Sequence, residues 1–224
     1  MRVRVRSHRT NLWYTAHMGR SSCAGKRGRR QGLRRSRTGT GSCGWHHTVI
    51  LHVDGTVYPC GCNKAGQCDL PWKPVLPLIR GQLQPWPCRA VSAGGFHTVL
   101  LSWNGRVTAF GDNTHGQCDI PVLEDDNLRY TAISAGVWHT VLLVNDGTVK
   151  AIGGSVGHKR CVRIPALEEG LTYTKISAGY NLTLLVRSDN KVVILGGSEG
   201  YIEGLVSCCL DAVFDGSIPV IDGS

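Results

Sequence analysis

The chain has 224 residues, of which 42% are apolar, a composition typical of a folded globular protein. No run approaches the roughly 18 consecutive apolar residues of a membrane-spanning helix, so no membrane association is expected. The net charge of +9 is unevenly spread. Residues 1–40 hold twelve Lys and Arg and no acidic residue, whereas the remainder holds thirteen basic and sixteen acidic residues. A mildly acidic body therefore carries a basic arm.

The arm, residues 1–40, is rich in Arg, Gly and Ser and has little apolar surface to bury, so it is expected to be disordered. Its basic runs, Lys26–Arg30 and Arg34–Arg37, are compatible with three roles. These are weak contact with nucleic-acid phosphates, a nuclear or organellar targeting signal, and a solvated extension. Residues 19–44 contain no aromatic side chain, which disfavours base stacking.

Ten cysteines would suit a disulfide scaffold, but that pattern belongs to short chains with a secretory leader. The Arg-rich N-terminus has no long apolar core and does not resemble such a leader. We expect reduced thiols and an intracellular protein, cytoplasmic or nuclear.

A unit of about 42 residues recurs along the body of the chain, since Ser92–Leu101 reappears as Ser134–Leu143. Four copies can be aligned, and such self-similarity indicates one supersecondary unit laid down several times. Each copy begins at an equivalent glycine: Gly44, Gly94, Gly136 and Gly179. A histidine follows at constant offset in three copies, His47, His97 and His139, and Leu182 replaces it in the fourth. Each copy ends at a further glycine: Gly61, Gly111, Gly153 and Gly196.

Short runs rich in Val, Ile, Leu and Thr flank an Asn-Gly or Asp-Gly pair in each of the first three copies. Such pairs predict hairpins with type I′ turns. The pairs are Asp54-Gly55, Asn104-Gly105 and Asp146-Gly147, with Asp189-Asn190 as a weaker fourth. A further strand precedes the first glycine of each copy, as in Tyr130–Ile133. Each copy is therefore predicted to be an antiparallel meander of three or four strands.

Repeated meanders stacked around an axis form a β-propeller, and a β-solenoid is the competing architecture. Because hairpin turns make antiparallel pairs, the propeller is favoured. We predict an all-β fold with four repeats over residues 41–205, at about 41–90, 91–132, 133–175 and 176–205. The tail, residues 206–224, is apolar enough to cover the exposed sheet edge that an unclosed propeller leaves.

The second copy carries the most specific motif, in which His97-Thr98 and Asn104-Gly105 precede Gly111-Asp112-Asn113-Thr114-His115-Gly116-Gln117. This pattern resembles the repeat of the regulator-of-chromosome-condensation family, whose members form seven-bladed β-propellers. The 42-residue period is closer to the compact blades of a related bacterial β-lactamase inhibitor. Four copies fall short of seven, so the resemblance implies a fragment, an open arc or a distorted four-bladed ring. We favour an incomplete propeller of four short antiparallel blades.

The recurring histidines His47, His97 and His139 could be ligands of one axial metal, but equivalent positions on successive blades diverge like spokes. We expect them to hydrogen-bond the backbone instead. The recurring glycines and histidines are therefore interpreted as structural parts of the repeat, and neither a metal nor a cofactor is expected.

Cys68 and Cys118 occupy one repeat position and are expected to pack as small apolar side chains. A metal site at Cys60, Cys62 and Cys68 is the less favoured alternative, because their spacing matches no familiar zinc motif. No Gly-x-Ser-x-Gly elbow, phosphate-binding loop or His-Glu-x-x-His motif is present, so no catalytic residue is proposed.

The stretch that joins the first two repeats is proline-rich and longer than its counterpart further on. Prolines are expected to keep it extended, and connecting loops on a rigid scaffold often carry recognition. The candidate partner-binding residues are Trp72, Lys73, Arg80 and Trp86. The alternative is that both tryptophans pack on neighbouring blades.

Gly44-Trp45-His46-His47-Thr48 is similar to a motif of light-sensing members of this family, in which tryptophans from several blades form a cluster. The positions equivalent to Trp45 are Gly95, Val137 and Tyr180. The sequence therefore predicts that no such cluster forms.

The favoured function is a non-catalytic β-propeller module that binds another protein through loops on one face. The resemblance implies two alternatives. One is the substrate-recruiting part of a HECT-type ubiquitin ligase, whose catalytic domain would not fit beside the repeats in this chain. The other is a guanine-nucleotide exchange factor for a Ran-like small GTPase. The expected partner is accordingly a protein, with a small GTPase or a ubiquitination substrate as candidates.

Overall fold

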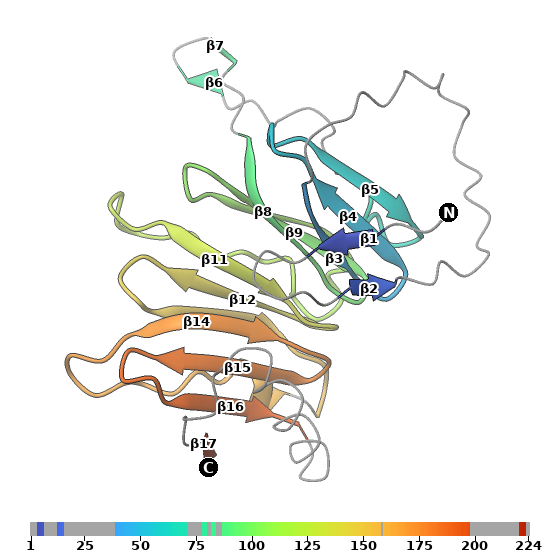
Figure 1. Cartoon of the computed structure of the whole chain (residues 1–224). Coiled ribbons are helices and arrows are strands. Elements are labelled where there is room, and N and C mark those ends of the chain that lie inside the picture. The colour runs from blue at the N-terminus through green and yellow to red at the C-terminus, as the bar shows by residue number, and fades with distance from the viewer. Residues whose placement is uncertain are drawn as a thin grey trace, which may run out of the picture.

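The computed structural model describes residues 39–70, 87–157 and 159–197 in full, and five further short strands outside these ranges. Four small antiparallel sheets follow one another in chain order and stack into an arc (Figure 1). The predicted all-β arc of four short blades is confirmed. Among the described residues no helix is long and apolar enough to cross a membrane.

Each sheet is a three-stranded meander whose middle strand pairs with both neighbours. The first sheet comprises β3 (Thr40–Cys43), β4 (His47–Leu51) and β5 (Val57–Gly61). The second comprises β8 (Cys88–Ala93), β9 (His97–Ser102) and β10 (Val107–Gly111). The third comprises β11 (Tyr130–Ala135), β12 (His139–Val144) and β13 (Val149–Gly153). The fourth comprises β14 (Tyr173–Ala178), β15 (Leu182–Arg187) and β16 (Val192–Gly196).

The remaining described elements lie outside these meanders. β17 (Val220–Asp222), within the predicted tail, adds to the fourth sheet by pairing parallel to β16. β1 (Arg4–Arg6) pairs with β2 (Trp13–Thr15), and β6 (Leu78–Ile79) pairs with β7 (Gln82–Leu83), both antiparallel. A short 3₁₀ helix, η1 (Lys159–Val162), precedes the fourth sheet. Apart from β1, β2 and residues 39–40, the arm that the sequence predicts to be disordered lies outside the described residues.

The hairpin turns form at the predicted dipeptides, but their type differs from the prediction. Gly55 has φ of 80°, and Asp54 is not in the positive-φ region that a type I′ turn requires. The bonds Gly55 N–H to His52 O (3.0 Å) and His52 N–H to Thr56 O (2.9 Å) instead fit a type I turn followed by a glycine bulge. The carboxylate of Asp54 accepts the Thr56 N–H at 2.9 Å, which stabilises the turn.

The hydrophobic core is divided into three layers, each between two consecutive sheets. Burying a Val or Leu side chain stabilises by about 1.5–3 kcal/mol, so most of the stability lies between blades. Between the first and second sheets lie Val49, Leu51, Val57, Leu70, Ala93 and Leu100. Between the second and third lie Val99, Leu101, Val107, Tyr130, Ala135, Leu142 and Val144. Between the third and fourth lie Val141, Leu143, Val149, Tyr173, Leu185, Val193 and Leu195.

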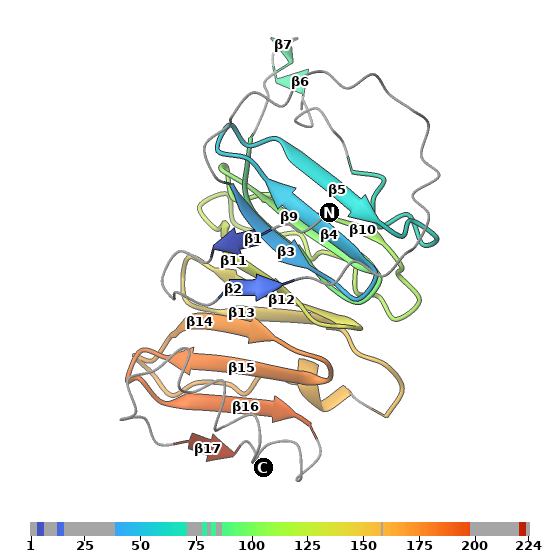
Figure 2. The ribbon, with the colours of Figure 1, turned by 45° about the vertical axis from the view of Figure 1, so that its right-hand side comes forward.

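The first sheet packs against the second, and no described three-stranded blade precedes it (Figure 2). In β9 and β12 the residues Leu100 and Leu142 face the preceding sheet and are 2% and 0% exposed. Their counterpart Ile50 in β4 has no described sheet before it and is half-buried. Among the described residues, no blade therefore covers this face of the first sheet.

The glycine that begins each repeat is required where a following blade packs against it. A methyl group at Gly136 would overlap the imidazole of His139 and the carbonyl oxygen of Gly179 in the next blade. Gly179 has no such constraint, because a Cβ there would meet nothing closer than Leu182 Cβ, at 3.8 Å. Neither glycine has a positive φ, so the requirement is one of space.

We expect Gly136→Ala to destabilise the protein by about 1–3 kcal/mol, the usual effect of overpacking, because both neighbours of the new methyl group are fixed. Gly179→Ala, the matched control at the equivalent position, should change stability by about 0.5 kcal/mol or less. Urea denaturation of the full chain measures both changes. Equal stabilities of the two variants would contradict the packing.

Candidate functional site

The inner strands of successive blades are tied together by the Ser-Ala-Gly segment that recurs in the sequence. The backbone N–H of the alanine donates to the serine hydroxyl of the preceding blade. The three bonds, each 2.9 Å, are Ala93 to Ser42, Ala135 to Ser92, and Ala178 to Ser134. The ends of the inner strands are therefore held in a fixed arc.

The histidine of each repeat connects to the next blade through a threonine hydroxyl. His97 Nε2 lies 2.9 Å from Thr140 Oγ1, and this hydroxyl donates to the Gln117 carbonyl at 2.8 Å. A hydroxyl has one hydrogen, so the imidazole must be the donor in the first bond. His47 with Thr98, and His139 with Thr183, repeat the arrangement at 2.8 and 2.9 Å.

This arrangement corrects the expectation that the histidines bond the backbone. The partner is a side chain of the next blade, and the backbone carbonyl accepts from the threonine instead. The sequence pattern His-Thr hides this, because the His and the Thr that bond each other come from different copies.

The imidazoles are neutral. Burial lowers the pKa of His97 to about 4 and that of His139 to about 4, and burial also lowers the pKa of His47. Each ring is committed to its own threonine, and the described residues contain no group of three His, Cys, Asp or Glu side chains that could hold a metal ion. Each of these rings therefore connects its blade to the next one through a threonine.

Cys68 and Cys118 lie half-buried in the loops that follow β5 and β10. Each thiol donates a weak hydrogen bond within its own loop, Cys68 to the Cys62 carbonyl and Cys118 to the Asp112 carbonyl, both at 3.3 Å. Burial, followed by the charge of Asp112, raises the pKa of Cys118 to about 12. A protonated, partly buried thiol suits packing and is a poor nucleophile or ligand.

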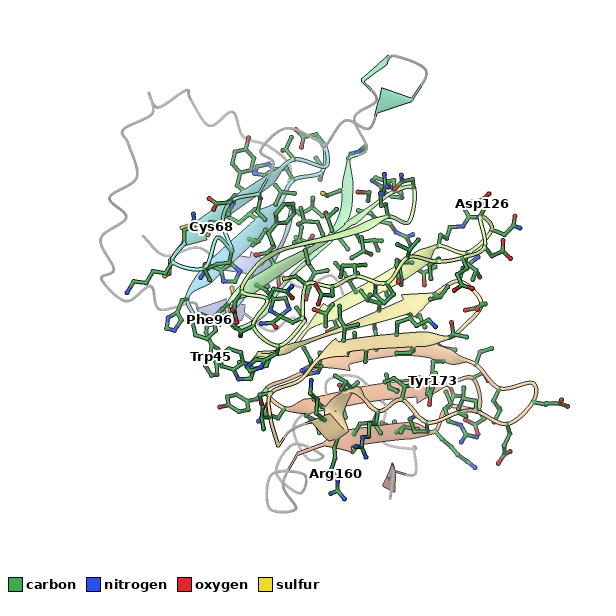
Figure 3. The ribbon with its side chains drawn as sticks, turned by 180° about the vertical axis from the view of Figure 1, so that it is seen from behind. Trp45, Cys68, Phe96, Asp126, Arg160 and Tyr173 are labelled. Carbon is green, nitrogen blue, oxygen red and sulfur yellow. The ribbon has the colours of Figure 1, made fainter. Side chains whose placement is uncertain are left out.

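The turns between the first and second strands of the blades gather aromatic side chains at one end of the arc. Trp45 of the first blade contacts Phe96, Trp138 and Tyr180, with ring centroids 5.8, 6.3 and 5.3 Å apart. Phe96 lies 5.2 Å from Trp138. We call Trp45, Phe96, Trp138 and Tyr180 the aromatic rim; Trp45 and Phe96 share one end of the sheets, away from Asp126 (Figure 3).

The aromatic rim corrects the prediction that no aromatic cluster forms. That prediction compared Trp45 only with its repeat equivalents, of which Tyr180 alone is aromatic. Phe96 and Trp138 stand one position later in their copies, and His46 occupies that position in the first. The turn brings both positions to the same end of the arc, so neighbouring columns of the alignment form one cluster.

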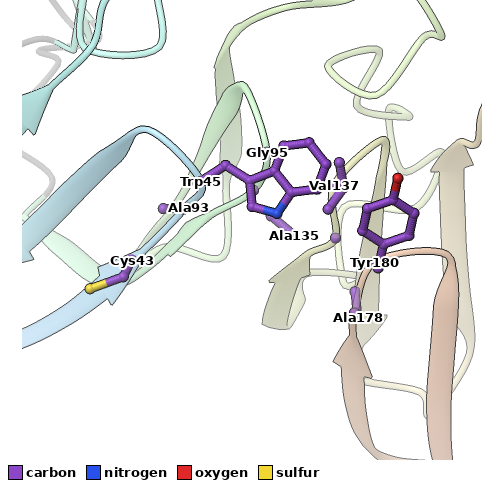
Figure 4. Close-up of a pocket in the computed structure, with 12 residues that line it drawn as sticks. Cys43, Trp45, Ala93, Gly95, Ala135, Val137, Ala178 and Tyr180 are labelled. Carbon is purple, nitrogen blue, oxygen red and sulfur yellow. The ribbon is translucent and has the colours of Figure 1, made fainter. Parts of the chain in front are cut away.

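The aromatic rim borders a shallow hollow of about 240 Å³. Its floor consists of the alanines and glycines that end the inner strands, and Trp45, Val137 and Tyr180 rise from the turns around it (Figure 4). Trp45 is 48% exposed and Tyr180 is 55% exposed. No Asp, Glu, Lys, Arg or His side chain is among the residues that line the hollow. The site therefore has no charged side chain in its lining and is open to solvent.

The predicted partner-binding residues Trp72, Lys73, Arg80 and Trp86 lie outside the described residues. The structure describes only the two short strands β6 and β7 between them. Their role in binding stays a prediction.

Comparison with known proteins agrees with this geometry. Residues 41–67 and 88–117 match the family model described as the regulator of chromosome condensation (RCC1) repeat. Prp20p from Saccharomyces cerevisiae is similar in structure, with a TM-score of 0.59 and 18% identity over 78% of this chain and 49% of that one. Human WBSCR16 has a TM-score of 0.58 and 20% identity over 84% of this chain and 51% of that one. No curated protein sequence matches significantly.

Four meanders tied blade to blade define an RCC1-like β-propeller arc. The chain resembles the RCC1 repeat family in its first two blades, where the family model matches, and shares its fold with the solved structures. It spans about half the length of Prp20p and of WBSCR16. At sequence identities of 18% and 20%, the similarity to these solved structures establishes the fold alone.

We expect Thr140→Val to destabilise the protein by about 3 kcal/mol, because the His97 N–H and the Gln117 carbonyl both lose their buried partner. In a His97→Leu background the same change should cost less, since the donor is already absent. Thr108→Val, at a half-buried threonine in β10, is the control and should be nearly neutral. Additive effects of His97→Leu and Thr140→Val in denaturation experiments would exclude the direct bond.

We also expect the melting temperature to fall steadily as the pH is lowered from 6.5 to 4. The pKa of His97 is about 4 in the native state and about 6.5 in the unfolded chain, so protons bind first to the unfolded chain. The stabilisation is complete above pH 6.5 and lost towards pH 4, by about 3 kcal/mol for His97 and a similar amount for His139. Differential scanning calorimetry measures the slope.

His97→Leu and His139→Leu should each remove part of this pH dependence, although both variants start from a lower melting temperature. A slope unchanged in the double variant would show that other groups cause it.

Proposed function

We propose that the chain is a non-catalytic module that binds another protein through the aromatic rim and its hollow. The main support for this proposal is that Trp45 and Tyr180 are exposed beside an uncharged hollow on a rigid arc. Trp and Tyr dominate binding energy at protein interfaces because they bury a large area with few rotatable bonds. The hydrogen bonds between inner strands hold the turns in place, which reduces the entropy lost on binding.

The state of the titratable groups supports a role without catalysis. His97 and His139 are neutral, 0% exposed, and bonded to threonines, so they do not reach a substrate. The thiols of Cys88, Cys118 and Cys161 all have a raised pKa because of burial, which keeps them protonated. None of these groups forms a nucleophile and base pair with another.

A small GTPase is the more specific candidate partner. The structure of Prp20p was reported with its binding to Gsp1p and histones, and the likeness of the folds is what favours this class of partner here. Guanine-nucleotide exchange on such a partner is the alternative to a plain binding module. An intracellular location, cytoplasmic or nuclear, belongs to both proposals. Recruitment of a ubiquitination substrate, and weak contact of residues 1–40 with nucleic acid, remain predictions from the sequence.

We expect Trp45→Ala to lose most proteins that associate with the full chain in cells, as measured by quantitative affinity purification. The control is Trp103→Ala, which removes a tryptophan that is 62% exposed in the turn at the opposite end of β9. Both variants should keep the wild-type melting temperature within a few degrees, because both side chains are largely outside the core. The proposal fails if the two variants retain the same proteins.

The GTPase candidate is tested separately, by adding the purified chain to a Ran-like GTPase loaded with fluorescent nucleotide. Accelerated release that is lost in Trp45→Ala would support exchange through the aromatic rim. Nucleotide release at the spontaneous rate would exclude the exchange activity, and the proposal of a binding module would remain.

A further inference from the structure

We propose that the hollow beside the aromatic rim binds a proline-rich segment in polyproline II conformation, namely residues 71–77 of a second copy of this chain. The inference rests on the proposed function, since it names an occupant for the same site. It predicts that the protein self-associates through one hollow and one segment.

The lining of the hollow offers three hydrogen-bond donors. The indole N–H of Trp45 and the hydroxyl of Tyr180 have no hydrogen-bond partner within the described residues. The Tyr180 backbone N–H is a third donor. Its counterpart in the third blade, Val137 N–H, donates to the Gly179 carbonyl at 3.2 Å, but the fourth blade has no described blade after it. The lining contains no carboxylate or carboxamide side chain.

This donor-rich, aromatic surface selects a ligand with carbonyl acceptors and few N–H groups. An ordinary extended peptide would bury several N–H groups, whereas the side-chain acceptors of the lining are limited to the Tyr180 hydroxyl and the weakly accepting Cys43 sulfur. Each N–H group left unsatisfied costs about 1–3 kcal/mol. Proline has no N–H, and its ring packs on aromatic faces. Aromatic-lined grooves bind polyproline II segments for these reasons.

The chain itself contains a matching segment, because Pro71, Pro74 and Pro77 are spaced three residues apart. A polyproline II helix has three residues per turn, so these prolines fall on one face of it. The intervening residues include Trp72, Val75 and Leu76, which add apolar surface. Over seven residues such a helix is about 22 Å long.

The described residues on either side of the segment lie away from the hollow of their own copy. Leu70, just before it, is 6% exposed in the core between the first two sheets. After it, the chain enters β8 at Cys88, whose N–H bonds the Gly55 carbonyl in the turn of the first sheet. That turn and the hairpin β6–β7 lie at the end of the sheets opposite to Trp45 (Figures 1 and 3).

A second copy must therefore supply the segment. Since the hollow and the segment are different parts of each copy, the contact is heterologous. It either closes by reciprocal exchange between two copies or continues from copy to copy. In both cases the association depends on protein concentration.

The test uses the full chain and a synthetic peptide with the sequence of residues 70–78, titrated by isothermal calorimetry. We expect binding that weakens by roughly 30-fold or more in Trp45→Ala, the effect of losing an aromatic contact of about 2 kcal/mol. Trp103→Ala is the matched control and should bind as wild type. Tyr180→Phe, which removes only the hydroxyl, should weaken binding by less than Trp45→Ala. A peptide with the three prolines replaced by alanine should not bind.

Sedimentation velocity of the full chain provides the second measurement. The wild type should show concentration-dependent association, and Pro71→Ala/Pro74→Ala/Pro77→Ala should sediment as a monomer. Peptide binding that is equal in wild type and Trp45→Ala would overturn the inference. A wild-type chain that stays monomeric at all concentrations would overturn the second copy as occupant. The peptide could fail to bind while Trp45→Ala still loses the cellular partners. In that case this inference is wrong and the proposed function stands.

Discussion

The structure depends on a buried hydrogen-bond relay that crosses each boundary between blades. A neutral imidazole donates to a threonine hydroxyl of the next blade, and that hydroxyl donates back to a loop carbonyl of the first, as in His97, Thr140 and Gln117. The groups are fully buried, so an unmet donor or acceptor would be costly. The relay therefore admits one relative position of neighbouring blades, and the three hydrophobic layers form around it.

The relay also positions the candidate site. Each histidine stands directly after the turn that carries the aromatic rim, so fixing the imidazole fixes the turn. In the fourth blade Leu182 replaces the histidine, and no described blade follows. There the backbone N–H of Tyr180 has no bond to a further described blade and lies beside an exposed ring. Under the proposed function, the same repeat provides rigid packing between blades and a binding surface at the fourth blade.

Much of the fold could be predicted from the sequence, because the information was local. The Asn-Gly and Asp-Gly pairs and the apolar runs beside them defined the hairpins, and the repeat defined their number. The turn type was wrong, because Gly55 takes positive φ and Asp54 does not. The histidine partner and the aromatic rim were missed for a different reason. Both depend on side chains from different copies, such as Trp45 and Trp138, that no single repeat contains.

The relay requires that the imidazoles connecting the blades are neutral and donate through Nε2. Nitrogen-15 NMR of the histidine-labelled full chain measures both properties. The structure predicts that His97 and His139 carry the proton on Nε2 at pH 7, leave Nδ1 unprotonated, and titrate near pH 4. Rings protonated on Nδ1, or titration midpoints near the ordinary value of 6.5, would contradict the account.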